Sequence, residues 1–217
     1  MARKPSIKKV SPTPDADPMV SILSAAMEEA AAVGWAHLSF EAVATRAGMK
    51  LGDVLAHVPT QAHLLARLAD HVDRTSLLGV SGVDHTQSVK DRLFDLLMRR
   101  FDVLQRHRAG ILALMAGVAR DPGEGLMLLG RLSRSMAVTL TAAGVSPHGL
   151  KGMAHVTGLK AVYLAGLRTW QKDESSDMAK TMAALDKALG YAERAANFSL
   201  SNLKMRRDKA DNAGASH

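Results

Sequence analysis

Residues 38–68 carry the pattern that decides the fold, and they read LSFEAVATRAGMKLGDVLAHVPTQAHLLARL. Ser39 is a residue type that caps helices, and the short helical segment after it is interrupted by Gly48. A second short helix is expected over Leu51–His57, because Pro59 restricts the backbone that precedes it. A tight turn between two helices usually needs one residue at positive φ, which glycine supplies. The pattern is typical of a helix-turn-helix.

The rest of the 217-residue chain also follows the helical period, and 47% apolar residues suffice for a substantial core. Ala, Leu, Met, Lys and Arg dominate, and no alternating run of β-branched and aromatic residues predicts a strand. The fold class expected is all-α, a three-helix N-terminal module followed by a larger helical body. Glycine, proline and capping residues divide the chain into about nine helices, expected near 19–33, 40–47, 51–57, 60–78, 87–108, 110–119, 123–143, 147–172 and 176–203.

Composition shifts divide the chain into four segments. Prolines and cations with few apolar residues predict a disordered basic arm over 1–17, and a similar tail is expected over 206–217. Between them we expect a helix-turn-helix domain over 18–66 and a larger helical domain over 67–205.

Charge and hydropathy bound the location and the partners. The longest uncharged stretch, 135–150, is too short and too polar to span a bilayer, and the basic start lacks the apolar run of a signal peptide, so a cytoplasmic protein is expected. The net charge is +7, yet residues 18–70 hold three cations against five anions. The positive excess therefore lies in the tails and the body rather than in the first compact segment.

Two groups of residues form recognisable motifs: Gly34-Trp35, Val43-Ala44-Arg46-Ala47-Gly48, Gly52, His57, Pro59 and Leu64-Leu65 near the N-terminus, and the stretch Trp170…Asp173…Ser176-Asp177…Thr181-Met182…Leu185-Asp186. Together they resemble the N-terminal signature and C-terminal helices of the tetracycline-repressor (TetR) family. The resemblance implies that 18–66 is a DNA-binding domain and 67–205 a domain for ligand binding and dimerisation. The resemblance covers nearly all of the chain between the two tails. It implies a homodimeric regulator of transcription that binds double-stranded DNA at a palindromic operator and responds to a small molecule.

The residues expected at DNA follow from this resemblance and from charge. They are Arg3, Lys4, Lys8, Lys9, Arg46, Lys50, Leu51, Asp53 and His57, with the cations on phosphate and Lys50, Leu51 and Asp53 nearest the bases. The second helix of the motif departs from the family pattern. Asp53, Leu55, Val58 and Gln61 stand where the family carries a small polar residue, a phosphate-binding Tyr, an aromatic and a Lys. Such losses reduce the counterion-release contribution to affinity.

Two further sets of residues are assigned to the helical body. In the family the last two long helices form a four-helix dimer interface, which assigns to it Gly158, Val162, Met178, Met182, Leu185 and Leu189. Packing inside a single subunit is the alternative for this stripe. Family members also enclose a pocket for a small apolar ligand, which we assign to Phe94, Met98, Phe101, Met115, Met127 and Met136, and a methionine-rich core is the alternative here.

Other functional classes are weakly supported by the sequence. Zero cysteines exclude disulfides, thiolate metal sites and cysteine nucleophiles, and the histidine pairs are too widely spaced to share one ion without other ligands. Phosphate-loop and serine-hydrolase motifs are missing, so no enzyme activity, metal or cofactor is expected. Two functions remain beside a DNA-binding regulator. One is a lipid- or isoprenoid-binding protein of the same fold, resembling the lipid-binding proteins of ubiquinone biosynthesis, and the other is a pure interaction module.

Overall fold

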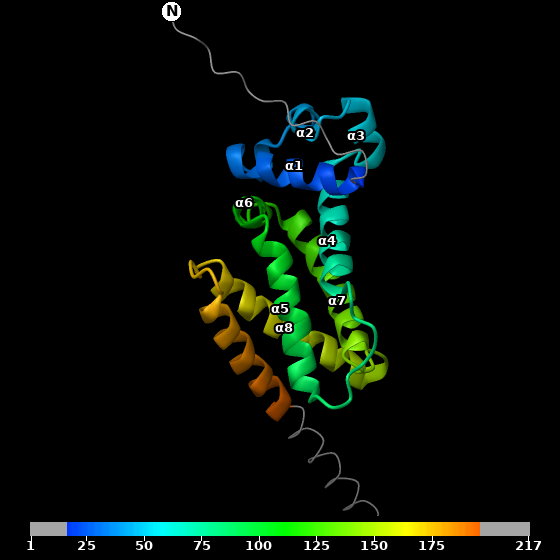
Figure 1. Cartoon of the computed structure of the whole chain (residues 1–217), viewed down its shortest axis with the longest axis vertical. Coiled ribbons are helices and arrows are strands. Elements are labelled where there is room, and N and C mark those ends of the chain that lie inside the picture. The colour runs from blue at the N-terminus through cyan, green and yellow to red at the C-terminus, as the bar shows by residue number, and fades with distance from the viewer. Residues whose placement is uncertain (1–16, 196–217) are drawn as a thin grey trace, which may run out of the picture. The chain divides into compact units, whose positions relative to one another are not determined.

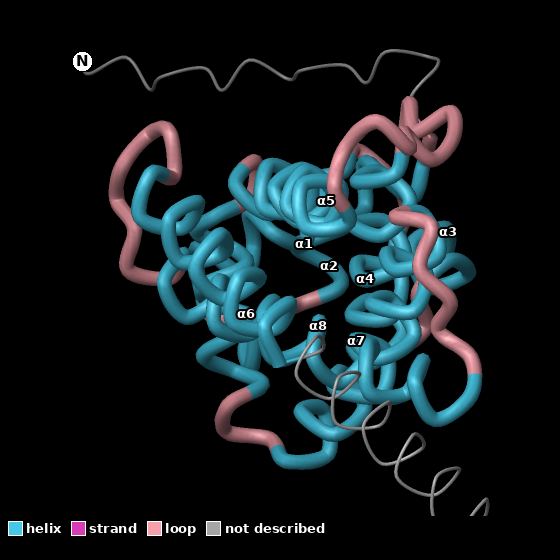
Figure 2. The backbone as a smooth tube through the Cα atoms, turned by 90° about the horizontal axis from the view of Figure 1, so that it is seen from below, coloured by secondary structure: helices cyan, strands magenta, loops and turns pink. Residues whose placement is uncertain are grey.

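The structure, a computed structural model, describes residues 17–195, and every regular element in this range is helical (Figure 2). The elements are α1 (Pro18–Val33), the 3-10 helix η1 (Trp35–His37), α2 (Phe40–Ala47), α3 (Leu51–His57), α4 (Gln61–Leu77), α5 (Val89–Gln105), α6 (Arg108–Val118), α7 (Pro122–Ala142) and α8 (Gly149–Trp170) (Figure 1). A C-terminal helix follows over 179–195, where the description ends. The all-α expectation is confirmed for this part of the chain. The tail at 206–217 and the arm, except Asp17, lie outside the described residues.

The observed helix boundaries lie close to those predicted from the sequence, and capping side chains explain several of them. Asp17 Oδ1 accepts from the Met19 amide at 2.9 Å, which caps α1 just before Pro18. Thr60 Oγ1 accepts from the His63 amide at 3.2 Å, as expected for the cap of α4. Ser39 stands at the N-cap of α2, as predicted, but its side chain makes no capping hydrogen bond.

The described residues fall into two compact units, each built from two stretches of chain. The first unit holds residues up to Val72 together with Val103–Leu128, and the second holds Asp73–Asp102 together with the residues from Leu129 onward. The first unit takes in α6 because that helix packs against α1. The expected division of roles at residues 66 and 67 concerns function and stays a prediction.

Close helix contacts in the first unit depend on two glycines of α6. A Cβ on Gly110 would lie 2.8 Å from the Met27 Cα, so only glycine lets α6 approach α1 this closely. A Cβ on Gly117 would lie 2.8 Å from the Trp35 Cβ, and Trp35 is only 2% exposed. Distances below about 3 Å between carbon atoms are strongly repulsive. These glycines fix α6 against α1 and η1.

The second unit is centred on aromatic side chains and on one close approach between helices. The Phe101 ring lies 5.4 Å from the Tyr163 ring and 6.4 Å from the Trp170 ring. A Cβ on Gly166 would lie 3.1 Å from Leu185 Cγ, so the C-terminal helix packs tightly on α8. This contact lies within one chain and buries Leu185 completely, at 0% exposure.

Asp173 joins α8 to the C-terminal helix through a buried carboxylate that is 1% exposed. Its Oδ2 accepts from the Thr181 amide and hydroxyl, both at 2.8 Å, and its Oδ1 accepts from the Ser175 amide at 3.2 Å and hydroxyl. The hydrogen bond from the Ser175 hydroxyl is the largest cause that lowers the pKa of Asp173 far below its usual range; Thr181 adds to it and burial opposes it. The motif that carried the resemblance thus has a structural role.

The length and hydropathy of the helices bear on membrane insertion. Across residues 17–195, no helix is both long enough and apolar enough to span a bilayer.

Candidate nucleic-acid interface

Helices α2 and α3 form the predicted helix-turn-helix in the first unit. Gly48 has φ 67° and ψ 27°, the left-handed conformation that the turn requires, and the Met49 amide donates to the Ala44 carbonyl at 3.0 Å. Val43 and Val54 are fully buried at 0% exposure and anchor the two helices on the same core. The anchoring leaves the opposite face of α3 in solvent.

The exposed face of α3 presents most of the residues predicted to lie near DNA bases. Lys50 at the N-cap, Asp53 in the first turn and His57 in the last turn are exposed, whereas Leu51 is partly buried. His57 Nδ1 lies 2.8 Å from the Asp53 carbonyl oxygen, so this nitrogen is occupied within the helix. Leu55 is 37% exposed and offers no hydrogen bond. Lys50, Asp53 and, through its other ring nitrogen, His57 are therefore the polar groups on the exposed face of α3.

Arg46 is engaged in an ion pair as well as facing solvent. Its Nε donates to Glu29 Oε2 at 2.7 Å, with the Glu29 side chain 8% exposed and the Arg46 side chain 41% exposed. The pair holds α2 on α1. Arg46 thus has a structural role that sequence reasoning did not identify, and its predicted contact with phosphate stays a prediction.

Gln61, one of the departures from the family pattern, is used to position the start of α4. Its Nε2 donates to the Trp35 carbonyl at 2.6 Å, and Trp35 Nε1 in turn donates to Glu124 Oε2 at 3.0 Å. This bridge joins η1, α4 and α7 within the first unit. Sequence reasoning missed it, since partners 26 and 89 positions apart leave no local pattern.

The electrostatic balance of this segment is negative. Residues 17–72 contain three cations and six anions. Arg3, Lys4, Lys8 and Lys9, the predicted phosphate contacts of the arm, lie outside the described residues. An interface with DNA on α3 would therefore depend strongly on cations from other parts of the chain.

The residues predicted to line a ligand pocket divide between the two units. In the second unit, Phe101 and Met136 are fully buried at 0% exposure, and Phe94 and Met98 are partly buried. Met115 and Met127 belong to the first unit and are partly buried there. The assignment of all six to one pocket stays a prediction.

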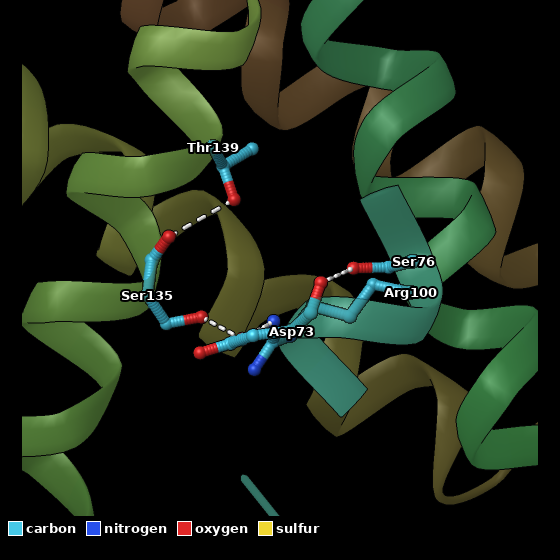
Figure 3. A network of polar contacts seen from close by, with 5 residues as sticks. All are labelled: Asp73, Ser76, Arg100, Ser135 and Thr139. Atoms are coloured by element: carbon cyan, nitrogen blue, oxygen red, sulfur yellow. Dashed lines mark hydrogen bonds and ion pairs between the residues drawn. The ribbon is translucent and has the colours of Figure 1, made fainter. Parts of the chain in front are cut away.

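Sequence reasoning also missed a buried polar cluster in the second unit (Figure 3). The Asp73 carboxylate accepts from Arg100 Nη1 and from the Ser135 hydroxyl, which joins α4 to α5 and α7. The Arg100 guanidinium carbon lies 5.1 Å from the centre of the Tyr163 ring on α8. Burial opposes the charge of Arg100, but Tyr163 and Asp73 outweigh it and raise the pKa of the guanidinium. The cluster thus holds a stable cation inside the body.

Four of the six residues predicted at a dimer interface are buried within the single chain. Exposure is 4% for Val162, 6% for Met178, 0% for Leu185 and 3% for Leu189, so for these four the alternative of packing inside one subunit describes the structure. Gly158 and Met182, the other two, are partly exposed. Helical spacing does not reveal which helix covers an apolar stripe, so a dimer interface that includes these six residues stays a prediction.

Metal binding has no support among the described residues. Within 17–195, no group of three or more His, Asp or Glu side chains is placed to hold an ion.

Comparison with known proteins finds solved structures with a similar fold. No protein-family model matches the sequence, and no curated protein matches it significantly. Among solved structures, it is similar to a TetR transcriptional regulator from Nitrosomonas europaea, with 20% identity and a TM-score of 0.68 over 82% of this chain and 99% of that one. A TetR transcriptional regulator from Rhodococcus sp. RHA1 has 23% identity and a TM-score of 0.55 over 81% and 94%. A TetR-family regulator from Streptomyces coelicolor has 16% identity and a TM-score of 0.56 over 87% of each chain. The helix-turn-helix at Gly48 and the helical body that follows it therefore have the fold of the TetR-family transcriptional regulators.

Proposed function

We propose that this protein is a TetR-like, cytoplasmic, homodimeric regulator of transcription that binds a palindromic DNA site and responds to a small apolar ligand. The observation that carries the proposal is the helix-turn-helix of α2 and α3, with Gly48 in the left-handed conformation and the polar side chains of α3 in solvent. The likeness to solved TetR regulators supports it. The activity proposed is binding rather than catalysis.

In this proposal α3 enters the major groove of DNA, and its exposed residues make different kinds of contact. Lys50 contacts phosphate or a guanine edge, while Asp53 accepts a hydrogen bond from a cytosine amino group. Arg46 and the four cations of the arm contribute phosphate contacts. A two-fold symmetric dimer doubles each of these contacts and matches a palindrome whose half-sites lie about one helical turn, roughly 34 Å, apart.

The lipid- or isoprenoid-binding alternative is not favoured, because the similar structures above are described as transcriptional regulators. One of the departures from the family pattern that supported this alternative also has a structural role. Gln61 replaces the family's lysine, and its side chain donates a hydrogen bond to the Trp35 carbonyl. The loss of that lysine is therefore no sign by itself that DNA binding has been given up.

The test is a selection of genomic fragments by the full-length protein, followed by fluorescence anisotropy at several salt concentrations. We expect one or more fragments to bind about a thousand-fold or more tighter than random duplex, the lower bound for specific sites. Lys50→Ala should weaken binding to all duplexes and lower the salt slope by about one per affected contact. Lys151→Ala is the matched control, since Lys151 is an exposed lysine of α8, which belongs to the second unit and not to the helix-turn-helix.

Two outcomes would contradict the proposal. One is equal affinity for every genomic fragment and for random duplex. The other is an equal effect of the Lys50 and Lys151 substitutions, which would remove α3 as the reading element.

A further inference from the structure

Arg100 on α5 is a buried cation, and its Nε–H is a buried donor without a partner among the described residues. The residue is only 7% exposed, and its Nη1 donates to the Asp73 carboxylate. Its Nε is buried and has no hydrogen-bond partner in the described structure. Native proteins rarely leave a buried donor without an acceptor, and each exception needs an explanation.

The neighbouring hydroxyls cannot serve as donors to a ligand, because their protons are already in use. Ser135 Oγ donates to the Asp73 carboxylate, Ser76 Oγ to the Asp73 carbonyl at 3.0 Å, and Thr139 Oγ1 to the Ser135 carbonyl at 3.0 Å (Figure 3). The Arg100 Nε–H is thus a buried donor of this cluster that no described residue accepts.

The charge balance around Arg100 selects the kind of acceptor. Asp73 already neutralises the guanidinium through a direct ion pair. A second carboxylate brought to the same place would leave a net negative charge in a buried site, and burying an uncompensated charge is strongly unfavourable. A neutral acceptor such as a carbonyl oxygen satisfies the Nε–H without that penalty.

Beside this polar cluster, aromatic and apolar side chains also surround Arg100. The Tyr163 ring faces the guanidinium at 5.1 Å, and this ring is followed by the Phe101 ring at 5.4 Å. Leu97, one helical turn before Phe101 on the same helix, is fully buried. The Asp73 side chain is 27% exposed, so the cluster reaches the surface on that side.

From these observations we propose that Arg100 Nε binds the carbonyl oxygen of an uncharged apolar ligand, such as an ester or a ketone. The inference rests on the proposed function for the existence of a ligand, and it specifies the chemical class of that ligand.

The experiment is a calorimetric titration of the full-length protein with three probes of similar length: methyl octanoate, nonane and octanoate, at neutral pH. The hydrogen bond from a charged donor should make methyl octanoate bind about ten- to a hundred-fold tighter than nonane. Octanoate should bind no tighter than the ester. The proposal is overturned if ester and nonane bind equally, if octanoate binds tightest, or if none of the three binds.

Arg100→Lys tests the donor directly, because lysine keeps a cation for Asp73 and has no N–H at the Nε position. We expect the preference for ester over nonane to disappear in this variant. Arg99→Lys is the matched control, since Arg99 is the adjacent, exposed arginine of α5 and should keep the wild-type preference. Thermal melts check folding, and the probe series on the wild type decides the matter if Arg100→Lys does not fold.

Duplex binding, measured on the same preparations, separates this inference from the proposed function. Selective binding of a genomic fragment together with failure of the probe series overturns the role of Arg100 alone. An ester preference without selective duplex binding overturns the regulator and leaves the role of Arg100 standing.

Discussion

Replacement of Arg46 by methionine is expected to lower stability as well as DNA affinity, because Arg46 neutralises a carboxylate that is almost fully buried. The Glu29 side chain is 8% exposed, and its Oε2 lies 2.7 Å from Arg46 Nε. Breaking a fully buried pair by removing one partner costs about 3–5 kcal/mol. The Arg46 side chain is 41% exposed, so water screens part of the interaction, and we expect a loss of about 2 kcal/mol.

The assay is a double-mutant cycle by urea unfolding, with Arg46→Met, Glu29→Met and the double variant. For a chain of this size, a loss of about 2 kcal/mol also lowers Tm by roughly 4–8 °C. The double variant should recover most of the lost stability, since methionines at both positions leave no unpaired buried charge. Its DNA affinity should stay reduced, because the proposed phosphate contact is not restored.

Either of two results would refute this reasoning. A double variant as unstable as the sum of the two single ones would mean that the pair is not coupled. A double variant with full DNA affinity would restrict Arg46 to its structural role.

Three further predictions follow from single features. Gly110→Ala should cost about 2–3 kcal/mol by forcing α6 away from the Met27 backbone, whereas Gly130→Ala, with open space around its Cβ, should be neutral or stabilising in the same urea assay. The pKa of Asp173 is lowered by folding, so its carboxylate stabilises the fold at pH values above 3.8, its ordinary pKa, and this contribution is lost as the pH falls below 3.8. Asp173→Asn should remove that part of the acid dependence of the unfolding free energy, and an unchanged pH profile would contradict the assignment. Deletion of residues 1–16 should lower the salt slope of duplex binding by about 0.9 per lost phosphate contact, whereas an unchanged slope would exclude the arm from the interface.

Local signals were sufficient to predict the fold. Gly48 and Pro59 lie on either side of α3 and limit its length through backbone restrictions that act within a few residues. The sequence therefore predicts both ends of α3 correctly. The approximate lengths of the later helices follow from the same glycine, proline and capping residues. Helix ends are decided locally, which is why a single sequence suffices for them.

The side-chain pairs of the sites were not predictable in the same way. Arg46 with Glu29, Gln61 with Trp35 and Asp73 with Ser135 each join different helices, and nothing in the sequence near either partner indicates the other. The apolar stripe of the C-terminal helix, which includes Leu185, was likewise not assignable to a partner from the sequence. Its spacing predicted a buried face correctly, but Gly166 of the same chain covers it, and only a structure distinguishes that partner from a second copy.

The acidic character of the proposed reading helix separates affinity from specificity. Asp53 repels the phosphate backbone wherever the helix lies in a groove, so it weakens binding to every duplex, random ones included. At a cytosine it gains a hydrogen bond, and at other bases it gains none, so the penalty is offset only at the correct sequence. A regulator of this kind needs its affinity from other cations, from Lys50, Arg46 and the arm, doubled by two-fold symmetry. The negative balance of residues 17–72 is then compatible with a DNA-binding role, because the ratio of specific to non-specific binding, rather than affinity alone, determines occupancy of a genomic site.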